Sequence, residues 1–333
     1  MRRSFILAIA LVFLVMAISA DNATAKPFYE GKILTLMVGT KPGGGFDTYA
    51  RLIAVYMKKH LPGSEIIVKN VPGAGHVLCV NQLYKKKPDG LTFALFSRSL
   101  IATQVAEVKG VKFDLGKLSW LGSCASGIRS LMVGKNTPYK TLDDLVKGDR
   151  VRFAAQGVGS MDYMDPLLVA KMLGAKNWVI STGYGGGEGE MAIIRGELDA
   201  AFMTWGSSGK KFLEEARALM FNNDQPVEGY EQIPILPNIA PKEYAGLVDL
   251  MLFMVRFNRP VAGPPGIPAD RLKILQDAFK QACQDPELLE QAKKIDVPIL
   301  FIGAEEGEKL VKNALNQPPE IVKLLKESYG VQN

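Results

Sequence analysis

The first residues whose types and spacing suggest chemistry are three consecutive glycines, Gly43, Gly44 and Gly45, followed closely by Asp47. Glycine has no Cβ, so an anion can approach its backbone closely. The first turn of a helix presents N–H groups that carry partial positive charge. The segment 42–47 is therefore predicted to bind an anion. The alternative interpretation is a plain connection between a strand and a helix.

The elements that would position this segment alternate between strand and helix. Short apolar runs predict strands, and each is followed by a segment rich in glycine or polar residues and then by a helical pattern. This order is typical of a mostly parallel sheet, in which ligands bind beyond the carboxyl ends of the strands. The predicted strands are 33–38, 65–69 and 91–96, and the segments that follow them are 42–47, 70–76 and 97–99.

The middle of the chain repeats this arrangement of strand, glycine-bearing turn and helix. A second α/β block with the same device indicates a ligand cleft between two lobes, whereas the alternative is that the glycines serve only tight packing. The strands expected here are 151–155, 178–181 and 200–203, and the segments at their ends are 157–160, 182–188 and 204–209.

The N-terminus fixes the expected compartment. Arg2 and Arg3 precede an apolar run at 5–18, and the small residues at 23–25 form a cleavage site. Residues 1–25 are therefore predicted to be a cleavable secretory signal peptide of Gram-negative type, which places the protein in the periplasm.

The order of elements also predicts the division into lobes. We expect a first lobe of residues 26–123 plus 258–333 and a second lobe of residues 124–257. The apolar run at 250–257 is interpreted as a core strand that leads the chain back to the first lobe. Amphipathic patterns predict further helices at 269–283, 287–294, 305–315 and 319–329.

Composition limits the classes of function. There are 40 Lys and Arg against 34 Asp and Glu, which gives a net charge of +6. This mild excess suits small anionic ligands, and the scattered basic residues predict no nucleic-acid partner. Cys79, Cys124 and Cys283 lie far apart, so they are expected to be buried thiols that form neither a metal site nor a disulfide framework. No cofactor or metal is expected.

Several motifs in one order resemble a known family. They are GGGFDTYAR at 43–51, NVPGAG at 70–75, PDGLT at 88–92, GVGS at 157–160, GELD at 196–199 and PPGIP at 264–268. Together they resemble the Bug (TctC-like) extracytoplasmic solute receptors of tripartite tricarboxylate transporters, whose pattern begins GG-x-x-D-x-x-A-R, then N-x-P-G-A-G, then P-D-G-Y-T. The resemblance extends over nearly all of the chain after the signal peptide.

The resemblance implies an α/β fold of the type II periplasmic binding protein (Venus-flytrap) kind, with two lobes joined by two crossover segments. It implies a monomeric receptor, not an enzyme, that captures a small organic carboxylate and delivers it to permease subunits in the membrane. Carried onto this chain, and together with the polar strand ends noted above, the expected ligand-binding residues are Pro42, Gly43, Gly44, Gly45, Phe46, Asp47, Gly73, Ala74, Gly75, Ser97, Arg98, Gly159, Ser160, Thr182, Gly183, Tyr184, Gly185 and Thr204.

The chain departs from the family pattern in three places. Leu91 stands where a tyrosine is usual, 161–163 lacks the common histidine, and 182–185 reads TGYG in place of Pro-Tyr-x-Gly. The last two lie on the second lobe, which is expected to contact the variable part of the ligand, so the resemblance leaves the identity of the carboxylate open.

Three further hypotheses follow from single residues or from the class of protein. Arg98 could pair with a distal carboxylate of the ligand or be a solvated surface residue. Ser160 and His76 could form a hydrolase pair across the cleft, although no Gly-x-Ser-x-Gly elbow is present. A receptor of this kind could also serve a membrane sensor in place of a permease.

Overall fold

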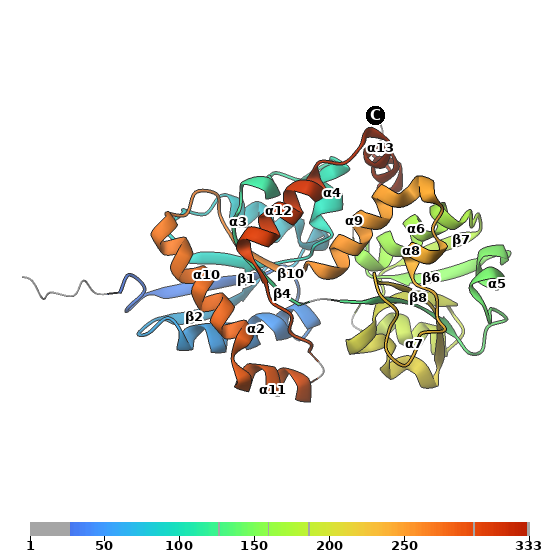
Figure 1. The fold of residues 1–333 in the computed structure, drawn as a ribbon, viewed down its shortest axis with the longest axis horizontal. Helices are drawn as coiled ribbons and strands as arrows, with labels where there is room; N and C mark the ends of the chain where they lie inside the picture. The colour runs from blue at the N-terminus through green and yellow to red at the C-terminus, as the bar shows by residue number, and fades with distance from the viewer. Residues whose placement is uncertain (1–26, 126, 159, 186, 296, 332–333) are drawn as a thin grey trace, which may run out of the picture.

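The computed structural model describes residues 27–331 except 126, 159, 186 and 296. The predicted signal peptide lies outside the described residues. Two α/β lobes lie side by side, each built on its own sheet (Figure 1). We call the part built on the six-stranded sheet the first lobe and the part built on the five-stranded sheet the second lobe.

The first sheet has the order β11-β4-β10-β3-β1-β2. Its strands β1, β2 and β3 run parallel, as the alternating pattern predicted, whereas β10 runs antiparallel to both β3 and β4. The strands are β1 (Ile33–Val38), β2 (Glu65–Asn70), β3 (Thr92–Leu95), β4 (Ser119–Ala125), β10 (Asn258–Gly263) and β11 (Ile302–Gly303).

Strand β1 is buried on both faces because helices cover both sides of this sheet. Leu34, Leu36 and Val38 belong to the core beneath α2 (Gly45–Lys59) and α10 (Ala269–Gln284). Met37 points the other way, into the core shared with α3 (Val77–Tyr84). Successive side chains of a strand alternate between faces, so one apolar run serves two cores.

The second sheet has the order β7-β6-β8-β5-β9. The three strands expected from the sequence, β6, β7 and β8, run parallel, because β6 is parallel to both of the others. Strand β5 adds antiparallel pairs with β8 and β9, so the complete sheet is mixed. The elements of this lobe are β5 (Arg129–Gly134), α5 (Leu142–Lys147), β6 (Val151–Ala155), α6 (Met161–Leu173), β7 (Trp178–Thr182), α7 (Glu188–Ile194), β8 (Ala200–Thr204), β9 (Ala216–Asn222) and α8 (Leu236–Ile239).

Two segments connect the lobes. The first joins β4 to β5, and the second runs through α9 (Ala245–Arg256) into β10. The prediction of a core strand at 250–257 is wrong, because residues 250–256 form the end of α9. The helix contacts β9 of the second lobe and α12 of the first, which buries most of its apolar residues and leaves Gly246, Asp249 and Arg256 exposed.

The C-terminal helices follow the sequence pattern closely. They are α10, α11 (Pro286–Lys294), α12 (Ala304–Leu315) and α13 (Pro319–Ser328). Earlier in the chain, the first lobe also contains the short helix α4 (Leu100–Val105). Asp285 caps α11 by accepting hydrogen bonds from two backbone N–H groups of its first turn. Helix α13 contacts both α4 and α6, so it packs against both lobes (Figure 1).

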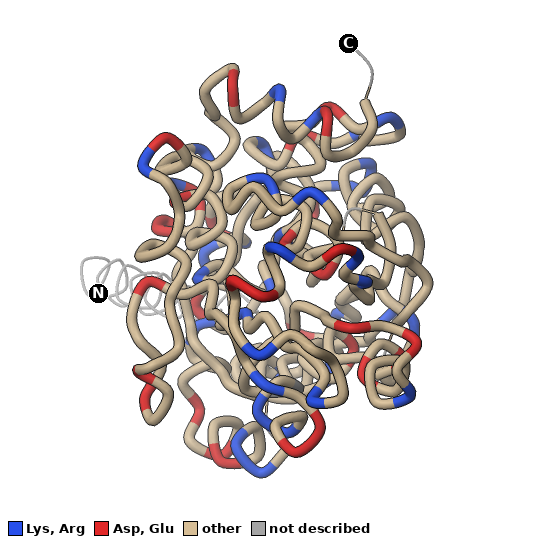
Figure 2. Tube along the Cα trace, turned by 90° about the vertical axis from the view of Figure 1, so that its right-hand side faces the viewer, with Lys and Arg blue, Asp and Glu red and all other residues tan. Residues whose placement is uncertain are grey.

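The charged residues and the cysteines lie as the sequence predicted. Basic and acidic positions are interleaved along the chain, as Figure 2 shows. The three cysteines are free and buried, as predicted. Among the described residues, no helix is long and apolar enough to cross a membrane, and no group of three or more His, Cys, Asp or Glu is arranged to hold a metal ion.

Candidate ligand-binding site

The glycine loop before α2 is organised by the carboxylate of Asp47. This buried carboxylate accepts hydrogen bonds from the backbone N–H of Gly43 at 2.9 Å, from Arg51 Nε at 2.8 Å and from Asn70 Nδ2 at 2.9 Å. The hydrogen bond from Arg51 is the main reason that the pKa of Asp47 falls to about 2. Asp47 thus fixes the loop and uses the Gly43 N–H, while Pro42, Gly44 and Gly45 lie exposed at the start of α2.

The second glycine loop, at 70–76, holds a buried histidine. Ala74 and His76 have positive φ angles of 46° and 78°, while Gly73, Ala74 and Gly75 are exposed. The His76 ring packs against Gly39 and lies 4.4 Å from the Phe46 ring, centroid to centroid. Burial, with the nearby positive charge of Arg259, lowers the pKa of His76 to about 3. The imidazole is therefore neutral at physiological pH and acts as a packing group beneath Phe46.

The buried His76 predicts a specific loss of stability in mild acid. The unfolded chain binds a proton at His76 below about pH 6.5, whereas the folded chain does so only near pH 3. Between these values the unfolded state holds more protons, so stability decreases as the pH falls, by about 2 kcal/mol from this residue at pH 5. Denaturant unfolding at pH 7.5, 6 and 5 measures the slope, and His76→Gln should flatten it.

The other histidine supplies the matched variant for this experiment. His60 lies half-buried at the C-terminal end of α2. His60→Gln should keep the part of the slope that comes from His76. The explanation is wrong if His76→Gln loses stability between pH 7.5 and 5 as steeply as the wild type.

The third strand end, at 97–99, lies at the joint between the lobes. The Ser97 and Ser99 hydroxyls are 2.7 Å apart. Arg98 is buried, and its Nη1 donates to the carbonyl of Val255 in α9 at 3.2 Å, a carbonyl that also accepts from the Gly127 N–H of the first crossover. Burial lowers the pKa of Arg98 to about 9, so the guanidinium stays charged at neutral pH. Arg98 thus ties α9 to the first lobe.

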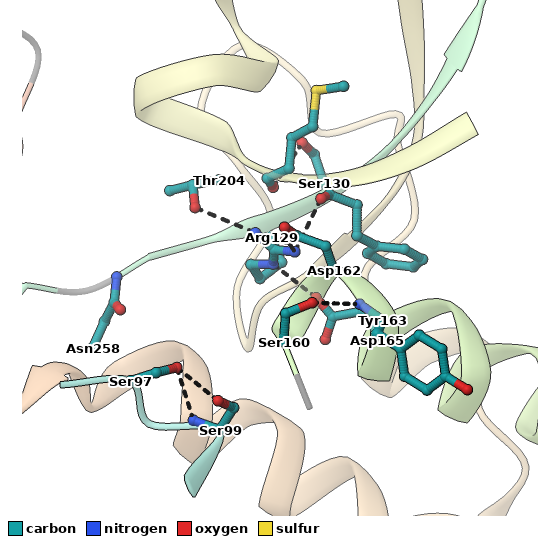
Figure 3. A network of polar contacts seen from close by, with 12 residues as sticks. Ser97, Ser99, Arg129, Ser130, Ser160, Asp162, Tyr163, Asp165, Thr204 and Asn258 are labelled. Carbon is teal, nitrogen blue, oxygen red and sulfur yellow. Dashed lines mark hydrogen bonds and ion pairs between the residues drawn. The ribbon is translucent and has the colours of Figure 1, made fainter. Parts of the chain in front are cut away.

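The second lobe contributes a buried ion-pair network centred on Arg129 in β5. Arg129 Nε lies 2.7 Å from Asp165, and Nη2 lies 2.6 Å from Asp162 and 3.0 Å from the Phe202 carbonyl. Its Nη1 also donates to Thr204 Oγ1 at 3.4 Å. Figure 3 shows this network on one side and Ser97, Ser99 and Asn258 of the first lobe on the other. The Arg129 side chain is therefore already neutralised by two carboxylates.

Ser160 caps helix α6 by accepting a hydrogen bond from the Tyr163 N–H at 3.3 Å. His76 packs on Phe46, and no hydrogen bond between Ser160 and His76 occurs among the described residues. Nothing in this geometry supports the hydrolase pair. Gly159 lies outside the described residues.

The end of β7 and the loop after it hold the remaining predicted residues of the second lobe except Thr204. Thr182 and Gly183 are exposed, and Tyr184 and Gly185 are half-buried. The Gly185 N–H donates to Glu188 Oε2 at 2.9 Å. As in the loop before α2, a nearby carboxylate uses one of the glycine amides.

Two cavities lie where residues of the two lobes meet. The larger, about 270 Å³, includes Ala74 and Gly75 of the first lobe, Val158 of the second and Tyr329 beyond α13. The smaller, about 180 Å³, we call the crossover cavity. It is lined by Gly45, Thr48, Tyr49, Thr204, Lys211, Asn258, Arg259, Ile295, Val297 and Pro298.

Of the predicted residues that the structure describes, four line these two cavities and the others line neither. Gly45 and Thr204, which are far apart in sequence, line the crossover cavity together, and Phe46 contacts its Arg259. Ala74 and Gly75 line the larger cavity instead, and Arg98 lines neither of the two.

Sequence reasoning missed the charged residues of this region. Arg259 and Asn258 begin β10 directly after the apolar run of α9, and Arg129 begins β5 directly after the first crossover. The available signal was the position of polar residues at the two crossings between lobes. None of these residues directly follows a glycine, so a pattern of glycine-bearing strand ends does not include them.

Comparisons with known proteins agree with this architecture. A model of the family described as "Tripartite tricarboxylate transporter family receptor" (TctC) matches residues 49–326. A UPF0065 protein of Bordetella pertussis is 24% identical over 321 residues, which cover 94% of this chain and 95% of that protein.

Two solved structures share the fold. MatC from Rhodopseudomonas palustris, with bound malate, has a TM-score of 0.69 at 19% identity and covers 88% of this chain and 99% of its own. A second R. palustris protein, with adipate, has a TM-score of 0.68 at 18% identity and covers 88% and 97%. With the family match spanning more than half of its residues, the chain belongs to the TctC family of tripartite tricarboxylate transporter receptors.

Proposed function

We propose that this protein is a periplasmic receptor that captures a small organic carboxylate between its two lobes. The observation that carries the proposal is the crossover cavity, whose wall combines the N-terminus of α2, the guanidinium of Arg259 and residues of the second lobe. The N-terminus of α2 carries partial positive charge and the Arg259 guanidinium a positive charge. Carboxylates form charge-assisted hydrogen bonds with such donors. The malate and adipate bound to two structural relatives are acids of this kind.

The two crossovers make the site sensitive to how the lobes are arranged. Gly45 and Thr204 come from different lobes, so the cavity is complete only when the lobes are close together. A ligand that contacts both lobes binds this closed arrangement more tightly than an open one. Binding therefore shifts the population toward the closed form, which is the form that a transporter can distinguish from the empty receptor.

The proposal extends to compartment, partners and assembly. Residues 1–25 direct export, after which a monomer delivers its ligand to permease subunits of a tripartite tricarboxylate transporter. The first lobe comprises 26–123 plus 258–333 and the second 124–257. The proposed boundary between 123 and 124 falls within β4, which ends at Ala125. Of the predicted residues, Gly45, Phe46 and Thr204 have the strongest geometric support as ligand contacts.

The test is direct binding of organic acids to the protein purified from the periplasm. Native mass spectrometry identifies retained ligand, and a thermal-shift screen followed by calorimetry compares acetate, malate, adipate and citrate. A ligand at 100 times its Kd should stabilise the fold by about 2.7 kcal/mol. The proposal is wrong if no organic acid is retained and none in the screen changes the unfolding temperature.

A further inference from the structure

Arg259 is a charged side chain held in an unusual way. It lies in β10 directly after the second crossover, with a φ of +58°, a conformation that costs a non-glycine residue energy. Its guanidinium carbon lies 3.8 Å from the centre of the Phe46 ring and 5.1 Å from that of Tyr49. Such strain persists where the surrounding packing enforces it, and it is concentrated at functional sites.

The hydrogen-bonding capacity of this guanidinium is largely unused. Nη1 donates to Asn258 Oδ1 at 3.1 Å, whereas Nε is buried and has no acceptor. None of the ion pairs among the described residues includes Arg259. An arginine has five N–H donors, so this side chain carries a full positive charge with donors to spare.

The other two arginines of this region differ from Arg259 in their partners or in their location. Arg129 is paired with Asp162 and Asp165. Arg98 donates to the Val255 carbonyl of α9 and, like Arg259, has a buried Nε without an acceptor. Neither lines the crossover cavity, whereas Arg259 does. Among these three arginines, Arg259 alone combines an unpaired charge with access to a cavity.

The surroundings of Arg259 complete a site for an acid. Arg259 Nη2 lies 3.4 Å from the point where a Cβ of Gly45 would be, which places it beside the first amides of the 15-residue helix α2. Val297 and Pro298 give the same cavity apolar wall, and Thr204 adds a hydroxyl from the second lobe. Its volume of about 180 Å³ is below the roughly 300–1,000 Å³ of sites for drug-sized ligands.

From this geometry we propose that Arg259 is the charged anchor that selects a carboxylate in the crossover cavity, and that the ligand is a short aliphatic acid. The inference rests on the proposed function and makes it specific. The carboxylate accepts from the Arg259 guanidinium beside the N-terminus of α2, and the carbon chain lies against Val297 and Pro298. Phe46 and Tyr49 hold the guanidinium plane by cation–π contact, and His76 supports Phe46.

The experiment compares Arg259→Gln and Arg259→Lys with the wild type by calorimetry. The probe is whichever of acetate, malate, adipate and citrate binds the wild type most tightly, together with its amide analogue. Arg259→Gln should weaken binding of the acid by about 10- to 150-fold, because a charge-assisted hydrogen bond is lost. The affinity of Arg259→Lys for the acid should lie between that of the wild type and that of Arg259→Gln. The preference for acid over amide should be large in the wild type and should shrink in Arg259→Gln.

Arg271→Gln is the matched control. Arg271 also stacks on a phenylalanine, at 4.0 Å from the Phe28 ring, also has a buried Nε without an acceptor and donates to a neighbouring oxygen, the Asp89 carbonyl. It lies in α10, outside the crossover cavity, so its replacement should leave affinity for the probe unchanged.

A measurement on the wild type covers the case in which the variants do not fold. Phenylglyoxal labels arginine, and mass spectrometry should show that the probe protects Arg259 while the exposed Arg256 is labelled equally with and without it. Equal labelling of Arg259 in both conditions overturns the inference, as does an Arg259→Gln variant with wild-type affinity and acid preference. In those cases the probe still binds, and the proposed function stands. If the wild type binds no acid, the proposed function itself fails.

Discussion

Asp165→Ala is expected to lower the free energy of unfolding by about 3–5 kcal/mol. Asp165 is fully buried on α6, and its Oδ2 lies 2.7 Å from Arg129 Nε. The Arg129 side chain is only 5% exposed, so removal of this carboxylate leaves a buried guanidinium with one acidic partner, Asp162. Losing one member of a buried ion pair costs this much because the remaining charge cannot regain its hydration. Denaturant unfolding followed by circular dichroism measures the change.

The control for this prediction is the same substitution at the surface. Asp143 and Lys147 form an ion pair on α5, but both side chains are about 70% exposed. Asp143→Ala should therefore change stability little, since water replaces the partner. The double variant Arg129→Leu/Asp165→Leu should lose less free energy of unfolding than the losses of the single variants Arg129→Leu and Asp165→Leu added together. A loss below about 1 kcal/mol for Asp165→Ala would show that the network does not act as a buried pair.

Gly39→Ala is expected to impair both the fold and ligand binding. A Cβ at position 39 would overlap the His76 ring and lie 2.8 Å from His76 Cβ, closer than packed carbon atoms approach. The imidazole must then move, although it is buried against Phe46. Overpacking of this kind typically costs about 1–3 kcal/mol of stability. Because Phe46 supports Arg259, we also expect affinity for the carboxylate to fall by about tenfold or more.

Unfolding and calorimetry on the same variant separate the two effects. Gly246→Ala is the control, because the added Cβ would have no neighbour within 4 Å on the exposed face of α9, where alanine favours the helix. The double variant Gly39→Ala/His76→Ala removes the overlap and should recover part of the stability lost in Gly39→Ala. If Gly39→Ala keeps wild-type stability and affinity, position 39 does not act on Arg259 through His76 and Phe46.

Local pattern was sufficient for most elements that position the site. The short apolar runs that end at segments 42–47, 70–76 and 157–160 are strands. Helix α2 begins at Gly45, and α6 begins after its capping residue Ser160. Thr141 and Asp285 cap α5 and α11, since their side chains accept hydrogen bonds from backbone N–H groups of the first turn. These features depend on neighbours within a few residues.

The helix α9 marks the limit of such reasoning. A short apolar run such as 250–257 fits a buried strand or a buried helix equally well by its pattern alone. Here both lobes pack around the run, and the backbone satisfies its own hydrogen bonds as a helix between them. Packing between the two lobes therefore selects the helix over the strand. The residues near the run in sequence do not reveal that packing.

The sequence by itself was enough to predict an α/β chain with motifs of the TctC family and glycine-bearing strand ends suited to an anion. Only the tertiary structure decided that Gly45 and Thr204 share a cavity with Arg259, while Gly75 lines another. The physical reason is that element type follows from nearby residues. The two crossovers determine how one sheet lies relative to the other. That relative position decides which strand ends and charged residues come together, and these residues are distant in the chain.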